Sequence, residues 1–223
     1  MTARSHVLRA AALGGAVVLA VSGLVAPAAA AASPAAAPVE SKTVAVSAWS
    51  SYGKPAEVRV DVIASTDATG VVTISDETEV LASGELSDRS ATLELPTTLE
   101  VGMHELTVHY EGSPDVAPSE GTAKVKITKA STTIKFTTTT AVRGKRAKLT
   151  VSVSAAGTAT KPAGTVVIRD GSTQIATGKV VAGTVTVTLP KLEAGTYKLR
   201  AAFAGGGLFE PSASAVAKLK VTK

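Results

Sequence analysis

The sequence contains no cysteine among its 223 residues. This excludes disulfides, thiolate nucleophiles, zinc sites with cysteine ligands and iron–sulfur clusters. Asparagine is also absent, so the chain has no N-glycosylation site and cannot form a Lys–Asn isopeptide cross-link. Aromatic residues make up only 3% of the chain, whereas hydrophobic residues reach 45%, much of it Ala and Val. Neither a disulfide nor a Lys–Asn isopeptide bond can therefore stabilise a fold of this sequence.

The N-terminal segment, residues 1–32, has the three-part layout of a secretory signal peptide. Arg4 and Arg9 supply positive charge, residues 10–25 form an uncharged apolar run, and small residues around Ala30 provide a cleavage site. An uncleaved membrane anchor is the alternative, but the apolar run is shorter than the roughly 20 residues that span a bilayer. We therefore expect cleavage, with no transmembrane anchor remaining afterwards.

The next segment, residues 33–41, is rich in Ala and Pro, and we expect a flexible or polyproline-like lead-in there. No second long apolar run follows. These features predict a secreted, extracellular protein that is either released or held at the cell envelope by non-covalent contacts.

The remainder of the chain consists of two copies of one unit. Similar segments recur at an offset of about 90 to 94 residues. The clearest matched pairs are 53–62 with 144–153, 70–76 with 164–170, and 124–129 with 218–223. We therefore predict two domains, residues 42–129 and 132–223, with almost no linker between them.

Within each unit, short runs of alternating apolar and polar residues are separated by Gly, Pro, Ser and Asp. Examples are the apolar positions 58, 60 and 62, and the positions 106, 108 and 110. This period of two predicts half-buried β-strands, and we find no helical periodicity after residue 32. The fold class is therefore all-β: two tandem antiparallel β-sandwiches of about seven strands each.

Residues 193–199 have the spacing of a tyrosine corner, in which a Tyr hydroxyl at the start of the sixth strand bonds back to nearby backbone. Tyr197 is this tyrosine, and Leu199 occupies the position where many immunoglobulin domains have a core cysteine. The first unit has His104 and Leu106 at the two corresponding positions.

With these motifs, the chain resembles bacterial immunoglobulin-like domains of the group 3 type. The resemblance rests on residues 144–145, 164–171, 194–197, 203–205 and 209–214, and it extends over both units. It implies two tandem immunoglobulin-like sandwiches that serve as an extracellular spacer or adhesion module. It also implies that no catalytic residues are shared within the family. We expect no cofactor.

Two histidines, His104 and His109, superficially resemble a zinc-protease motif. That motif needs two histidines four residues apart on a helix, whereas these are five apart on a predicted strand and should point to opposite faces. Residues 205–207 are glycines, but the strand-to-helix context of a phosphate loop is missing, so we predict a turn. We expect no enzyme; a hydrolase would need a pocket that joins one histidine to Ser and Asp.

Two further ligand signals are weak. Residues 76–79 carry three carboxylates suited to calcium, but their counterpart at 170–173 keeps only one, which favours a polar hairpin turn without metal. Trp49 and Tyr52 form a candidate glycan-stacking pair; packing at the domain edge is the alternative.

The net charge of +5 conceals a split between the two units. Residues 41–129 have a net charge of −7, with seven basic and fourteen acidic residues. Residues 130–223 have a net charge of +11, with fourteen basic and three acidic residues. The first domain is therefore acidic and the second is basic.

Strand alternation places several of these cations on one outer face of the second domain, because the third, sixth and seventh strands share a sheet. The predicted face consists of Arg169, Lys198, Arg200, Lys218 and Lys220. One hypothesis is that it binds anionic cell-wall polymers, such as teichoic-type phosphates, or an acidic protein partner, including the first domain of another copy. Solubility and protection of sheet edges remain the alternative role for these charges. Nucleic acid is not expected as a partner of a secreted chain.

The sequence thus predicts a secreted, non-enzymatic repeat protein that acts as a cell-surface structural or adhesion module. A carbohydrate-binding or enzyme-accessory module of the envelope is the alternative, and Trp49 and Tyr52 are the aromatic signal for it.

Overall fold

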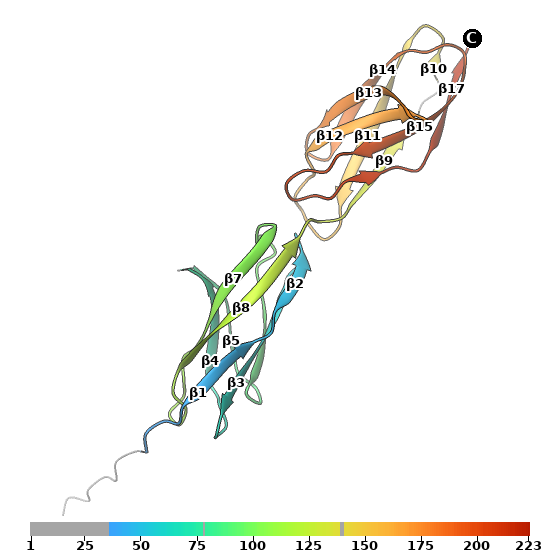
Figure 1. The fold of residues 1–223 in the computed structure, drawn as a ribbon. Helices are drawn as coiled ribbons and strands as arrows, with labels where there is room; N and C mark the ends of the chain where they lie inside the picture. The colour runs from blue at the N-terminus through green and yellow to red at the C-terminus, as the bar shows by residue number, and fades with distance from the viewer. Residues whose placement is uncertain (1–35, 78, 139–140) are drawn as a thin grey trace, which may run out of the picture. The chain divides into compact units, whose positions relative to one another are not determined.

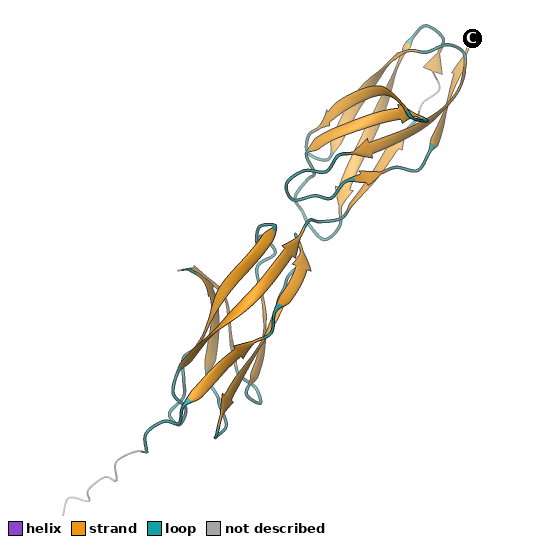
Figure 2. Ribbon diagram, viewed as in Figure 1, coloured by secondary structure: helices purple, strands orange, loops and turns teal. Residues whose placement is uncertain are grey.

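The computed structural model describes residues 36–77, 79–138 and 141–223. The predicted signal peptide and residues 33–35 of the lead-in lie outside this range. All regular elements of the described residues are β-strands, as Figure 2 shows. The prediction of an all-β fold is therefore confirmed.

The first domain contains eight strands in its described part (Figure 1). They are β1 (Ser41–Ala45), β2 (Ala48–Ser51), β3 (Glu57–Ala64), β4 (Val71–Asp76), β5 (Glu79–Glu85), β6 (Ser90–Glu94), β7 (Gly102–Tyr110) and β8 (Ser119–Thr128). One sheet has the order β1-β3-β6 and the other the order β2-β8-β7-β4-β5. The two sheets form a sandwich around one hydrophobic core.

The second domain repeats this plan with nine strands in its described part. They are β9 (Thr132–Thr137), β10 (Ala141–Val142), β11 (Arg146–Ala155), β12 (Gly164–Asp170), β13 (Thr173–Val180), β14 (Thr184–Lys191), β15 (Gly195–Phe203), β16 (Ser212–Ala213) and β17 (Ala217–Thr222). The sheet orders are β14-β11-β9 and β10-β17-β15-β12-β13, with β16 paired to β15. The third, sixth and seventh predicted strands are β12, β15 and β17, and they do share a sheet.

The first predicted strand of each domain is divided between the two sheets. β1 pairs antiparallel with β3, and after Val46 and Ser47 the chain crosses to the other sheet, where β2 pairs parallel with β8. β9 and β10 repeat this change of sheet, and β10 is parallel to β17. This division, together with the two-residue β16, raises the strand count above the predicted seven.

Burial alternates along the strands as the sequence pattern predicts. In β3, Val58, Val60 and Val62 are at most 1% exposed, and the residues between them face outward or are partly exposed. Leu106 of β7 and its counterpart Leu199 of β15 are fully buried in their respective cores. Each such side chain contributes roughly 1.5–3 kcal/mol by leaving water. Aliphatic packing therefore holds each pair of sheets together.

Backbone pairing in the first sandwich continues on the N-terminal side of β1. Val39 forms a parallel bridge with Val116, and the Val39 amide donates to the Asp115 carbonyl. Ala130 does the same in the second domain, where it bridges Phe209 and is fully buried. The end of the predicted lead-in thus belongs to the fold, because Val39 packs against the first core.

The tyrosine corner is confirmed, and its counterpart in the first domain uses a histidine. The Tyr197 hydroxyl donates to the Glu193 carbonyl at 3.0 Å. His104 Nε2 lies 2.9 Å from the carbonyl of Glu100, the equivalent acceptor. A carbonyl oxygen only accepts, so His104 Nε2 must carry the proton. Two different side chains thus close the same turn.

We predict that Tyr197→Phe lowers the free energy of unfolding of the second domain by about 1 kcal/mol, because one hydrogen bond is lost while the ring keeps its packing. Urea unfolding of residues 33–223, followed by circular dichroism, measures this loss. His104→Phe is the matched variant and should produce a similar loss in the first domain. Unchanged unfolding of both variants would show that the corner hydrogen bond does not stabilise either sandwich.

Candidate functional site

The five predicted cations lie on adjacent strands of the β10-β17-β15-β12-β13 sheet. Arg169 of β12 is directly opposite Arg200 of β15, and Lys198 of β15 is directly opposite Lys218 of β17. Lys220 is two residues farther along β17, on the same face as Lys218. All five are exposed. We call this set, Arg169, Lys198, Arg200, Lys218 and Lys220, the basic face.

Part of the hydrogen-bonding capacity of the basic face is used locally. Arg169 Nη1 donates to the Ser172 carbonyl at 3.0 Å, and Arg200 Nε donates to the Ser214 carbonyl at 3.2 Å. The remaining guanidinium donors and the three ammonium groups form no salt bridge within the described residues. The nearby Asp170 carboxylate accepts the backbone amide of Lys198 at 2.8 Å.

The corresponding face of the first domain has a different charge pattern. Lys124 occupies the position of Lys218, but it is opposite Glu105. Ser75 is opposite Thr107 at the positions of Arg169 and Arg200. Opposite charges or neutral hydroxyls therefore face each other in the first domain, whereas like charges face each other in the second.

Two like-charged pairs directly opposite one another destabilise a sheet. The penalty is small at an exposed surface and decreases with salt. An anion with several charges removes this penalty when it binds, and guanidinium and ammonium groups suit phosphate or carboxylate oxygens. The basic face thus brings five cations of β12, β15 and β17 together on one side of a sheet.

Trp49 and Tyr52 differ in their exposure. Trp49, in β2, is 79% exposed. Tyr52 follows the end of β2, is partly buried and packs against the first core. The Tyr52 amide also continues the β2–β8 ladder by donating to the Thr128 carbonyl at 2.8 Å. The two rings therefore do not form one exposed platform.

The two histidines lie on different faces of β7, as predicted. His104 has the parity of the buried Leu106, and its Nδ1 is 3.9 Å from Asp76 Oδ2. His109 faces outward, with its Nδ1 3.5 Å from Glu120 Oε1. Since Nε2 of His104 is already bonded to the Glu100 carbonyl, this imidazole is not directed at a serine.

The acidic segment that we expect to form a hairpin turn lies between β4 and β5, which pair antiparallel, and Thr78 lies outside the described residues. Asp76 is opposite Glu79, and Glu77 has a positive φ of 49°. The equivalent position in the second domain is Gly171, which also has a positive φ. Among residues 36–77, 79–138 and 141–223, no group of three or more His, Asp or Glu side chains is arranged to hold a metal ion.

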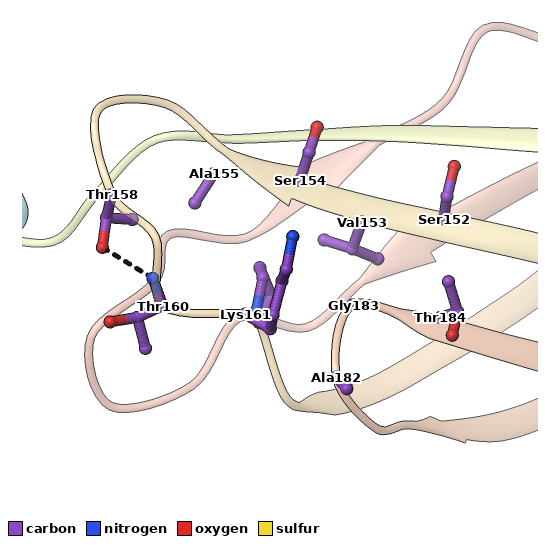
Figure 3. A pocket seen from close by; sticks show the side chains of 11 residues that line it. Ser152, Val153, Ser154, Ala155, Thr158, Thr160, Lys161, Ala182, Gly183 and Thr184 are labelled. Carbon is purple, nitrogen blue, oxygen red and sulfur yellow. Dashed lines mark hydrogen bonds between the residues drawn. The ribbon is translucent and has the colours of Figure 1, made fainter.

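A shallow hollow lies beside the β14-β11-β9 sheet of the second domain, with a volume of ≈ 250 Å³. Its walls come from the end of β11, the loop that follows and the β13–β14 turn, and Lys161 stands in its middle (Figure 3). The hydroxyls of Ser152 and Ser154 donate to backbone carbonyls of β9. The lining contains no carboxylate or imidazole that could act as a general base.

A comparison with protein families agrees with three features of the chain: the sequence duplication, the tyrosine corner and the matching sheet orders of the two domains. The profile described as "Bacterial Ig-like domain (group 3)" matches residues 42–128 and again residues 132–222. The chain belongs to this family. Its two group 3 Ig-like domains correspond to the two sandwiches described above.

Solved structures with similar folds were found at low sequence identity. The titin domains Z1Z2 in complex with telethonin are 16% identical, with a TM-score of 0.40, and cover 83% of this chain and 93% of theirs. Fibronectin(III)-like modules of Clostridium thermocellum CbhA are 15% identical, with a TM-score of 0.32, and cover 80% and 92%. No curated protein matched the chain.

Membership of this family is consistent with a role as a structural or binding module. Ig-like domains are typically not catalytic. Bacterial Ig-like domains are often extracellular. Within the described residues, no helix has the length and apolar character needed to cross a membrane.

One carboxylate of the first domain has a clearly altered titration. Arg59 Nε and Nη2 both donate to Asp61 Oδ1 at 3.0 Å, and this hydrogen bonding lowers the pKa of Asp61. A lowered pKa in the folded state means that the ionised form stabilises the fold. This stabilisation is complete above the pKa of the unfolded chain and is lost as the pH falls through the folded pKa.

We therefore predict that Asp61→Asn destabilises the first domain at pH 7 but not at pH 2. The pair is exposed, so the difference at pH 7 is at most about 1 kcal/mol. Urea unfolding at both pH values measures it. Asp115→Asn, at an exposed carboxylate without an ion pair in the described residues, is the control. An equal effect of Asp61→Asn at both pH values would contradict the prediction.

Proposed function

We propose that this protein is a secreted, non-enzymatic module that is held at the bacterial envelope by contacts between the basic face and anionic polymers. The basic face is the observation that carries the proposal: five exposed cations on three adjacent strands, with like charges opposite one another. Secretion is supported by the signal-peptide pattern of residues 1–32 and by the usual location of the family.

The arrangement favours a polymer over a small anion. The five cations are spread over the outer surface of three adjacent strands. Neighbouring strands are about 4.8 Å apart, and alternate residues on a strand are about 6.8 Å apart. A chain with regularly spaced phosphates can therefore meet several cations at once, and many weak contacts add up when they are linked.

The negative charge of the first domain also favours polymer binding through the second domain alone. The first domain's net charge of −7 repels a polyanion, so binding is confined to the second domain. The surfaces of the first domain then remain available for other contacts. An acidic partner, including the first domain of another copy, would compete for the same face.

We predict that residues 33–223 sediment with isolated cell walls that contain phosphate polymers. Salt at 1 M should release the protein, because the Debye screening length is then only about 3 Å. A variant with Gln at all five positions of the basic face should stay in the supernatant. Walls stripped of their phosphate polymers should retain neither protein. The bound polymer should also raise the melting temperature of the wild-type protein.

A matched control changes five other cations of the second domain, which gives the same net charge. These are Lys135, Arg146, Lys148, Lys161 and Lys191, on or beside the β14-β11-β9 sheet. This control should remain bound to the walls. Equal loss in both variants would show that net charge alone determines retention. Retention of the basic-face variant would refute the proposal, and salt-sensitive self-association that this variant abolishes would assign the face to a second copy.

A further inference from the structure

Trp49 is the only tryptophan of the chain and is 79% exposed. It lies on β2, the edge strand of the larger sheet of the first domain. Its neighbour Ser50 points inward, so the indole is not needed to fill the core. A solvent-exposed tryptophan ring presents a large apolar surface that does not contribute to core packing. Such residues commonly mark binding sites.

The strand register places a specific row of side chains beside Trp49. Trp49 is directly opposite Lys126 of β8, and Lys126 is directly opposite Met103 of β7. Met103 is 66% exposed and lies on the same outer face. Since adjacent strands are about 4.8 Å apart, the row from Trp49 to Met103 spans about 10 Å. Thr196 occupies the position of Met103 in the second domain, opposite Lys220.

Polar groups border the indole on its other side. A shallow hollow at the edge of the sandwich is lined by Ser47, Ala48, Trp49, Pro55 and Glu57. The exposed Glu57 carboxylate and the Ser47 hydroxyl can both hydrogen-bond a ligand that rests on the ring. Trp49 thus shares this hollow with Glu57 and is opposite Lys126 in the sheet.

The side chains around Trp49 fit some classes of ligand better than others. The apolar area consists of two side chains separated by an ammonium, far less than the roughly 800 Å² that each partner buries in a stable protein interface. Glu57 and the net charge of −7 disfavour an anionic ligand. A sugar ring has an apolar C–H face and a rim of hydroxyls, which match an indole bordered by donors and acceptors.

We infer that Trp49, Lys126, Met103 and Glu57 form a binding site for a neutral polysaccharide strand on the first domain. The ring of Trp49 stacks on one pyranose ring, Met103 contacts a ring farther along the strand, and Lys126 and Glu57 bond sugar hydroxyls. The site differs from the predicted pair of Trp49 and Tyr52. It is also independent of the basic face, which lies on the other domain.

The single tryptophan makes the site directly observable. Titration of residues 33–223 with cellohexaose, chitohexaose and mannohexaose should change the emission of Trp49 in a saturable manner for at least one of them, with a dissociation constant on the order of 0.1–1 mM. By calorimetry, Trp49→Ala should weaken binding about tenfold or more. Trp49→Phe should retain part of the affinity, and Met103→Thr and Glu57→Gln should each weaken it.

Two control variants test whether binding depends on this particular row of side chains. Val80→Ala removes an exposed apolar side chain at the opposite edge of the same sheet and should bind normally. The basic-face variant should also bind normally, so failure of one proposal does not affect the other. The inference is wrong if none of the three sugars changes the emission, or if Trp49→Ala binds like the wild type. Emission that changes only with protein concentration would instead assign Trp49 to contacts between copies.

Discussion

Both domains depend on one constraint: apolar side chains alternate along each strand, and those that point inward have only one another as partners. The chain has no cysteine for a disulfide, and the described cores consist mainly of Val, Leu, Ile and Ala. Each sheet is therefore retained by aliphatic packing with its partner sheet. A slip of one residue in any strand would turn its apolar residues into water, so the register is strongly fixed.

The same register determines what each domain presents to its surroundings. Once the inward residues are fixed, the residues between them must lie outside, and their identity can change without loss of the fold. The two copies use this freedom differently. The second domain places like charges opposite one another on β12, β15 and β17, whereas the first places Trp49, Lys126 and Met103 in one row. Duplication thus preserves the cores while the outer faces diverge.

Much of this could be predicted from the sequence, because period-two patterns and the tyrosine-corner spacing depend on local chemistry. The strand alternation, the shared sheet and the hydrogen bond of Tyr197 all follow from such signals. Other features depend on long-range pairing. Val39 looked like part of a flexible lead-in because its partner, Val116, is far away in sequence. Likewise, Met103 becomes a neighbour of Trp49 only through β8, which no local pattern in either segment reveals.

The change of sheet within the first strand has a mechanical consequence. It places the initial segment of each domain parallel to the final one: β2 beside β8, and β10 beside β17. When the two ends of such a domain are pulled apart, these neighbours are drawn in opposite directions along their length. The hydrogen bonds between them then resist shear together and are not unzipped one by one. Either domain therefore resists a load that passes through both of its ends better than strands unzipped one by one would.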